Sequence, residues 1–112
     1  DMQKMNFDFP FQLLEPWYSV DDGVALVDEL KKEVRKDGIL HGSEVEAIAR
    51  RGDCDDVLFE IKNGRNERFA VVHLTWSGKT DSNEGWPSTT LYTDIEAWKI
   101  ECMEPDHDDF TC

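Results

Sequence analysis

The sequence predicts a single α+β domain over residues 1–112, with an antiparallel sheet of three to four strands and two helices packed on one face. Three observations predict this fold. Residues 53–76 alternate apolar with other side chains on both sides of an evident turn, which is the period that a pleated strand imposes. One segment with helical apolar spacing precedes this hairpin, and another follows it. The expected order is arm, helix, three or four strands, helix.

The first element is an extended N-terminal arm, residues 1–17. Phe7, Phe9 and Phe11 alternate with polar residues and Pro10, and a proline restricts a strand to the edge of a sheet. We expect the aromatic row to pack on the core of its own subunit. Exchange of the arm with a second copy, which would give a homodimer, is the alternative.

The first helix is expected between Ser19, a suitable N-cap, and Gly38, a suitable terminator. Its apolar residues recur at intervals of three and four and form one stripe toward the sheet. The members of this stripe are Val20, Val24, Leu26, Val27, Leu30 and Val34.

The strands are expected at residues 43–51, at both arms of the 53–76 hairpin, and at residues 88–92 as a fourth. Asn63-Gly64 would suit a two-residue turn, but we expect a loop of three or five residues. Such a loop puts one apolar row from each arm on the same face. These rows are Val57, Phe59 and Ile61 on the first arm, and Phe69 and Val71 on the second.

The second helix should open at Thr93, with Glu96 in the capping-box position. Ile95, Trp98 and Cys102 mark its buried stripe, and Pro105 should end it. Residues 105–112 then form an acidic C-terminal tail.

Charge and cysteine usage limit the classes of partner and the compartment. With 25 acidic against 12 basic residues, the net charge of −13 disfavours nucleic acid and anionic membrane surfaces. A macromolecular partner should be a protein with a basic face, although solubility alone would also explain the charge. The three cysteines, with no short spacing, specify neither a disulfide framework nor a zinc knuckle, and no apolar run approaches membrane-spanning length. We therefore expect a cytoplasmic protein without a cofactor.

The best candidate for a ligand or interface site surrounds the polar loop 77–87, which two tryptophans bracket. The candidate residues are His73, Thr75, Trp76, Lys79, Trp86 and Tyr92. No nucleophile elbow or cysteine-protease signature accompanies His73, so a hydrogen-bonded, buried histidine is preferred over a catalytic base, and no catalytic residue is predicted.

Acidic residues cluster at 53–56 around Cys54 and again at 104–109, and they offer oxygen ligands for a hard cation such as calcium. Their spacing does not match the EF-hand loop. Turn and cap roles explain the first cluster and a solvated terminus explains the second, so no metal is expected.

The segments Asp55–Phe59, Val71–Trp76, Trp86–Pro87 and Glu96–Trp98 resemble a group of small, uncharacterised bacterial proteins. The resemblance covers about the last two-thirds of the chain. It implies a bacterial cytosolic origin and no established activity.

Two functions remain. The first is an inhibitor-like or immunity-like protein-binding module without catalytic activity, favoured slightly by the charge asymmetry. The second is a small-ligand-binding protein or minor enzyme with a pocket around Trp76, Trp86 and His73.

Overall fold

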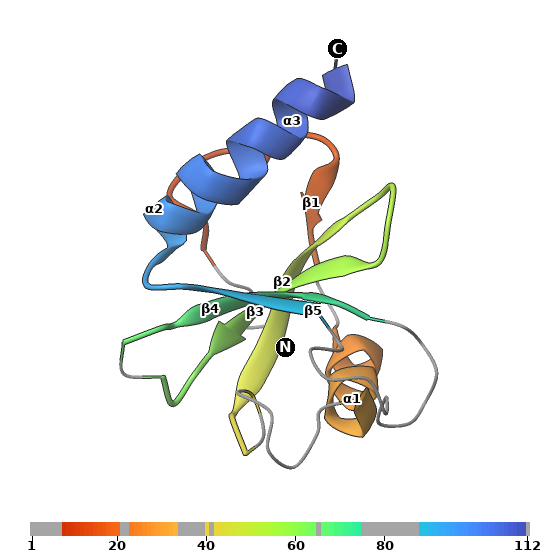
Figure 1. Cartoon of the computed structure of the whole chain (residues 1–112), viewed down its shortest axis with the longest axis vertical. Coiled ribbons are helices and arrows are strands. Elements are labelled where there is room, and N and C mark those ends of the chain that lie inside the picture. The colour runs from red at the N-terminus through yellow and green to blue at the C-terminus, as the bar shows by residue number, and fades with distance from the viewer. Residues whose placement is uncertain are drawn as a thin grey trace, which may run out of the picture.

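A five-stranded antiparallel sheet forms the centre of the computed structural model (Figure 1). The strands lie in sequence order: β1 (Trp17–Ser19), β2 (Val45–Arg51), β3 (Asp56–Ile61), β4 (Phe69–His73) and β5 (Ser88–Tyr92). Four helical segments accompany them: α1 (Val24–Glu33), α2 (Ile95–Trp98), the π-helical η1 (Lys99–Met103) and α3 (Glu104–Thr111). The structure describes residues 8–20, 23–33, 40, 42–64, 66–74 and 88–111. The predicted α+β class with an antiparallel sheet is thus confirmed, and the sheet has five strands rather than the three or four predicted, because β1 joins its edge.

Each face of the sheet carries its own helix, which corrects the prediction that both helices pack on one face. Leu26 and Leu30 of α1 pack with Phe59 on one face, whereas Trp98 and Met103 pack with Leu58 and others on the opposite face. Figure 1 shows α1 on one side of the sheet and α2 to α3 on the other. Neighbouring strand residues point to opposite faces, so a strand buried on both faces needs two apolar rows.

The register of the β3–β4 hairpin differs by one residue from the predicted one. Glu60 pairs with Phe69 and Phe59 with Ala70, so an even number of residues separates each pair. The predicted loop of three or five residues is therefore wrong. Phe69 lies on the face that carries Leu58, not on the face of Phe59. Because Leu58 puts an apolar residue in the second row of β3 as well, the alternation alone did not determine which row Phe69 joins.

The helix α1 begins later than predicted because Ser19 belongs to β1, where it pairs with Ala49. Val24 is the first helical residue, and the Gly23 carbonyl accepts the first helical hydrogen bond from the Val27 amide at 2.9 Å. Val24 is 64% exposed, so it is not part of the buried stripe. The predicted Gly38 terminator lies outside the described residues.

The C-terminal helix also begins one residue later than predicted and ends much later. Asp94 rather than Thr93 is the N-cap, and its side chain accepts a hydrogen bond from the Ala97 amide at 2.7 Å. Pro105 does not end the helix, because α3 runs from Glu104 to Thr111. A proline in a helix removes one donor and clashes with the carbonyl four residues earlier. The wider π-helical turn directly before it accommodates the ring.

The described part of the N-terminal arm packs on the core beside the C-terminal helix. The rings of Phe9 and Phe11 lie 6.2 and 6.3 Å from the Trp98 ring, between centroids. Further along, the Leu14 amide donates to the Met103 sulfur at 3.4 Å. The arm therefore covers the second core on the side of α2 and η1. Among the described helices, none has the length and apolar character needed to cross a bilayer.

Candidate functional site

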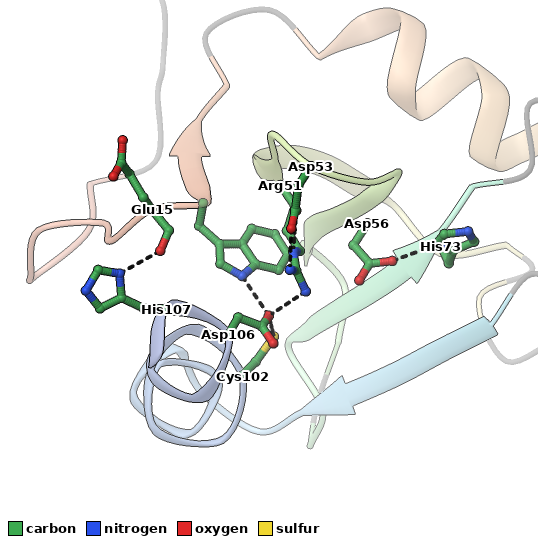
Figure 2. Close-up of polar contacts among 9 residues, drawn as sticks. Glu15, Arg51, Asp53, Asp56, His73, Cys102, Asp106 and His107 are labelled. Atoms are coloured by element: carbon green, nitrogen blue, oxygen red, sulfur yellow. Dashed lines mark hydrogen bonds and ion pairs between the residues drawn. The ribbon is translucent and has the colours of Figure 1, made fainter. Parts of the chain in front are cut away.

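Three side chains that can carry chemistry meet at one end of the sheet, where β3 begins and β4 ends. Asp56 and His73 are direct partners in the β3–β4 register. Their side chains lie on the same face and form a hydrogen bond of 2.7 Å between Asp56 Oδ1 and His73 Nδ1 (Figure 2). Cys54 lies in the turn that leads into β3, and its sulfur, a carboxylate oxygen of Asp56 and a ring nitrogen of His73 lie within 4.8 Å of one another. We call these three residues the sheet-end cluster.

The Cys54 thiol in this cluster is not an activated nucleophile. Burial raises its pKa above the ordinary value of 9.0, and the negative charges of Asp56 and Asp53 add to the increase. The Asp56 amide, which donates a hydrogen bond to the sulfur, and the Arg51 charge act in the opposite direction but do not reverse it. A catalytic cysteine needs a lowered pKa so that the thiolate is present near neutral pH. The cluster therefore lacks the activated thiol that a cysteine-based hydrolytic dyad needs.

A second polar group, centred on Asp106 of α3, joins the C-terminal helix to the sheet. Asp106 Oδ2 accepts from Trp17 Nε1 at 2.9 Å and from the Cys102 thiol at 3.5 Å (Figure 2). The Arg51 guanidinium lies 3.3 Å from the same oxygen and also forms two hydrogen bonds with Asp53, at 2.9 and 2.8 Å. Arg51 thereby links the turn after β2 to α3. This arrangement holds three elements together and leaves Asp106 Oδ2 occupied by protein donors.

The charges of the turn are paired in a way that shifts their pKa values. The Arg51 guanidinium lowers the pKa of the Asp53 carboxyl below 3.8, and the hydrogen bond that Arg51 donates to Asp53 is the largest cause that raises the pKa of Arg51. His107 of α3 instead contacts the arm, because its Nδ1 donates to the Glu15 carbonyl at 2.7 Å. The acidic residues at 53–56 and at 104–109 thus contact cations or hydrogen-bond donors, or are exposed to solvent. Among the described residues, the two groups do not form a shared calcium site.

Tyr92 and Cys102 are neighbours in the core beneath the C-terminal helix. Burial is the main cause that raises the pKa of the Tyr92 hydroxyl, and Cys102 beside it contributes. Burial also raises the pKa of the Cys102 thiol to about 12, and the Asp106 charge acts in the same direction. Both groups stay protonated across the ordinary pH range, so they act as packed, hydrogen-bonding core residues.

The structure places two of the six predicted site residues and separates them. His73 and Tyr92 lie on one face of the sheet, but Tyr92 pairs with Phe69, four residues from His73 on β4. Four strand residues span roughly 13 Å, so the two side chains do not share a site. The other four residues, Thr75, Trp76, Lys79 and Trp86, lie outside the described residues.

Sequence reasoning missed Cys54 and Asp56 as partners of His73. The available signal was the hairpin register, because the correct pairing puts Asp56 opposite His73. The predicted odd loop puts them on opposite faces of the sheet.

No protein-family model, curated protein or solved structure matches the chain. No functional residue or activity is therefore transferred to it from a relative.

Proposed function

We propose that this chain is a protein-binding module, of inhibitor or immunity type, that docks a basic partner through the outer side of its C-terminal helix. The observation that carries this proposal is the composition of the exposed surface of η1 and α3. Glu101, Asp108 and Asp109 are exposed there, beside Ile100 and Phe110, which are 54% and 48% exposed. Acidic groups interspersed with apolar side chains suit a partner face that combines Lys or Arg with an apolar pocket.

The position of these acids adds to the argument. The last turn of α3 carries Asp108 and Asp109 and no basic residue. Negative charge at a helix C-terminus is disfavoured by the macrodipole by roughly 0.3–1 kcal/mol per residue. A cationic partner would offset this cost when it binds. Figure 1 shows the last turn of α3 extending beyond the sheet, where a partner has access to it.

The overall charge favours the same class of partner. A net charge of −13 gives a field that speeds the encounter with a basic surface at low ionic strength. It also disfavours nucleic acid and anionic membranes, whose phosphates would be repelled.

The proposal includes a location in the bacterial cytoplasm. Cys54 and Cys102 are free thiols, which suits a reducing compartment.

A homodimer by exchange of the arm is the alternative assembly. In an exchanged dimer, Phe9 and Phe11 would make their contacts with Trp98 of the second copy, and native mass spectrometry would distinguish the two assemblies.

The test begins with capture of partners on the immobilised full chain at low salt, followed by measurement of Kd for each purified pair. The variant pair Asp108→Asn and Asp109→Asn should weaken Kd roughly 5- to 10-fold, since two exposed ion pairs contribute about 1 kcal/mol together. Phe110→Ala should weaken Kd by about 10-fold or more if its ring fills a pocket.

The matched control is the pair Glu44→Gln and Glu67→Gln. It removes the same charge from exposed positions away from the C-terminal helix. The proposal is wrong if both variant pairs weaken Kd equally, or if Kd does not change between low and high salt.

A further inference from the structure

We infer that the sheet-end cluster, Cys54, Asp56 and His73, binds a divalent transition-metal ion of the zinc class. Within the described parts of the chain, these residues form one group of three potential metal ligands. The inference is independent of the proposed docking surface, which lies on the C-terminal helix.

The donor atoms select the class of metal. The cluster offers one sulfur, one imidazole nitrogen and one carboxylate oxygen. Ca²⁺ and Mg²⁺ require mainly oxygen ligands, so a set with sulfur and nitrogen does not suit them. Zn²⁺ and Co²⁺ accept all three donor types, and zinc sites with three protein ligands leave a fourth position for water.

The distances are close to those of a bound ion. Ligand atoms around a tetrahedral Zn²⁺ lie roughly 3.3–3.7 Å apart, given bonds of about 2.0–2.3 Å. The three atoms of the cluster lie within 4.8 Å of one another, and the Asp56–His73 pair lies at 2.7 Å. Shifts of about 1 Å or less in side-chain positions would therefore produce the coordinated geometry. In that geometry the proton that now joins the Asp56 and His73 side chains leaves to solvent, the neutral ring carries its proton on the other nitrogen, and the metal lies between the two ligand atoms.

Two contacts partly offset the burial and the acidic charges that favour the protonated Cys54 thiol. The Asp56 amide donates a hydrogen bond to the Cys54 sulfur, and the Arg51 guanidinium contributes positive charge nearby. Such contacts from outside the ligand set orient a sulfur ligand and stabilise its negative charge. When the metal binds, the thiol proton is released to solvent, since the thiolate is the ligand.

The backbone limits how far the ligands can move apart. Asp56 and His73 are paired residues on neighbouring, hydrogen-bonded strands, and Cys54 is only two residues from Asp56. Their side chains remain accessible, because that of Asp56 is 25% and that of His73 is 42% exposed. An ion can therefore reach the cluster from solvent without unfolding of the sheet.

The test is titration of the reduced, full chain with Co²⁺, followed by displacement with Zn²⁺. We expect one equivalent to bind and to give the near-ultraviolet charge-transfer band of a cobalt–thiolate bond. Excess Zn²⁺ should remove this band. His73→Gln should weaken Co²⁺ binding by more than the roughly 10–100-fold that loss of an outer-shell partner costs.

Two cysteine variants locate the bond. Cys54→Ser should remove the charge-transfer band, whereas Cys112→Ser, the control, should retain both the band and the stoichiometry. Circular dichroism establishes that each variant is folded, and if Cys54→Ser is not, His73→Gln decides the outcome. The inference is overturned if the native chain gives no band, if Cys54→Ser retains it, or if folded His73→Gln binds Co²⁺ as tightly as the native chain.

Discussion

Replacement of Asp106 by alanine should destabilise the protein strongly, because one carboxylate oxygen serves three elements. It accepts from Trp17 Nε1 and from the Cys102 thiol, and it faces Arg51 at 3.3 Å. A hydrogen bond to a charged group contributes about 1.5–3 kcal/mol. The partly exposed ion pair with Arg51 adds about 0–1 kcal/mol. We expect Asp106→Ala to lower the free energy of unfolding by about 2–4 kcal/mol and Tm by about 10–20 °C.

Urea denaturation followed by circular dichroism would measure this loss. Asp109→Ala is the matched control, because it removes one negative charge from an exposed position of the same helix and should change stability by less than about 0.5 kcal/mol. A double-mutant cycle of Asp106→Ala with Trp17→Phe should give a coupling of about 1–2 kcal/mol. The reasoning is refuted if this coupling is below about 0.3 kcal/mol, or if Asp106→Ala resembles its control.

Three further predictions concern a helix cap, the close approach of Gly23 to β2, and a buried thiol. Asp94→Ala should cost about 1 kcal/mol in thermal denaturation, because the Ala97 amide loses its acceptor, and Asp94→Ser should recover most of it. Gly23→Ala should cost about 1–3 kcal/mol, since the new Cβ would lie 2.6 Å from Ala47 Cβ; no loss would show that α1 can move off β2. Burial raises the pKa of Cys102 from 9.0 to about 12, so the unfolded chain loses this proton first. Stability should therefore fall as pH rises from about 9 to about 12, and a Cys102→Ser variant that shows the same fall would contradict this cause.

The class of the fold was accessible from sequence because its evidence is local. Alternation over residues 53–76 and three-to-four spacing in the flanking segments depend only on neighbours along the chain. The distribution of helices over the two faces was not accessible in this way. It depends on whether Leu58, which lies between two other apolar residues, faces solvent or a second core, and the structure buries it completely.

An error of one residue in the predicted register of the central hairpin was enough to hide the pairing of Asp56 with His73. A shift of one residue changes the face of every side chain on a strand. With the odd loop, Asp56 and His73 lie on opposite faces; in the structure they share a hydrogen bond. The identities of the two residues were known from the sequence, but their pairing was not.

The start of the C-terminal helix could not be predicted to the exact residue, because two adjacent residues have similar ability to act as the N-cap. Thr93 and Asp94 can both accept a hydrogen bond from a helical amide. The backbone decides between them, because Asp94 has the extended conformation of an N-cap, with φ −149° and ψ 175°. No sequence rule fixes this choice, since it follows from where β5 leaves the sheet.

The π-helical turn before Pro105 also sets the angular phase of the C-terminal helix. Trp98 and Asp106, both turned toward the sheet, are eight residues apart, which in an ideal α-helix leaves them about 80° out of phase. One extra residue absorbed in η1 leaves an effective spacing of seven, about two complete turns. Deletion of the exposed Ile100, combined with Pro105→Ala because the proline ring needs the wide turn, would therefore restore a regular α-helix while both anchors keep their orientation. This helix can tolerate a change in length where a regular helix would rotate its contacts away.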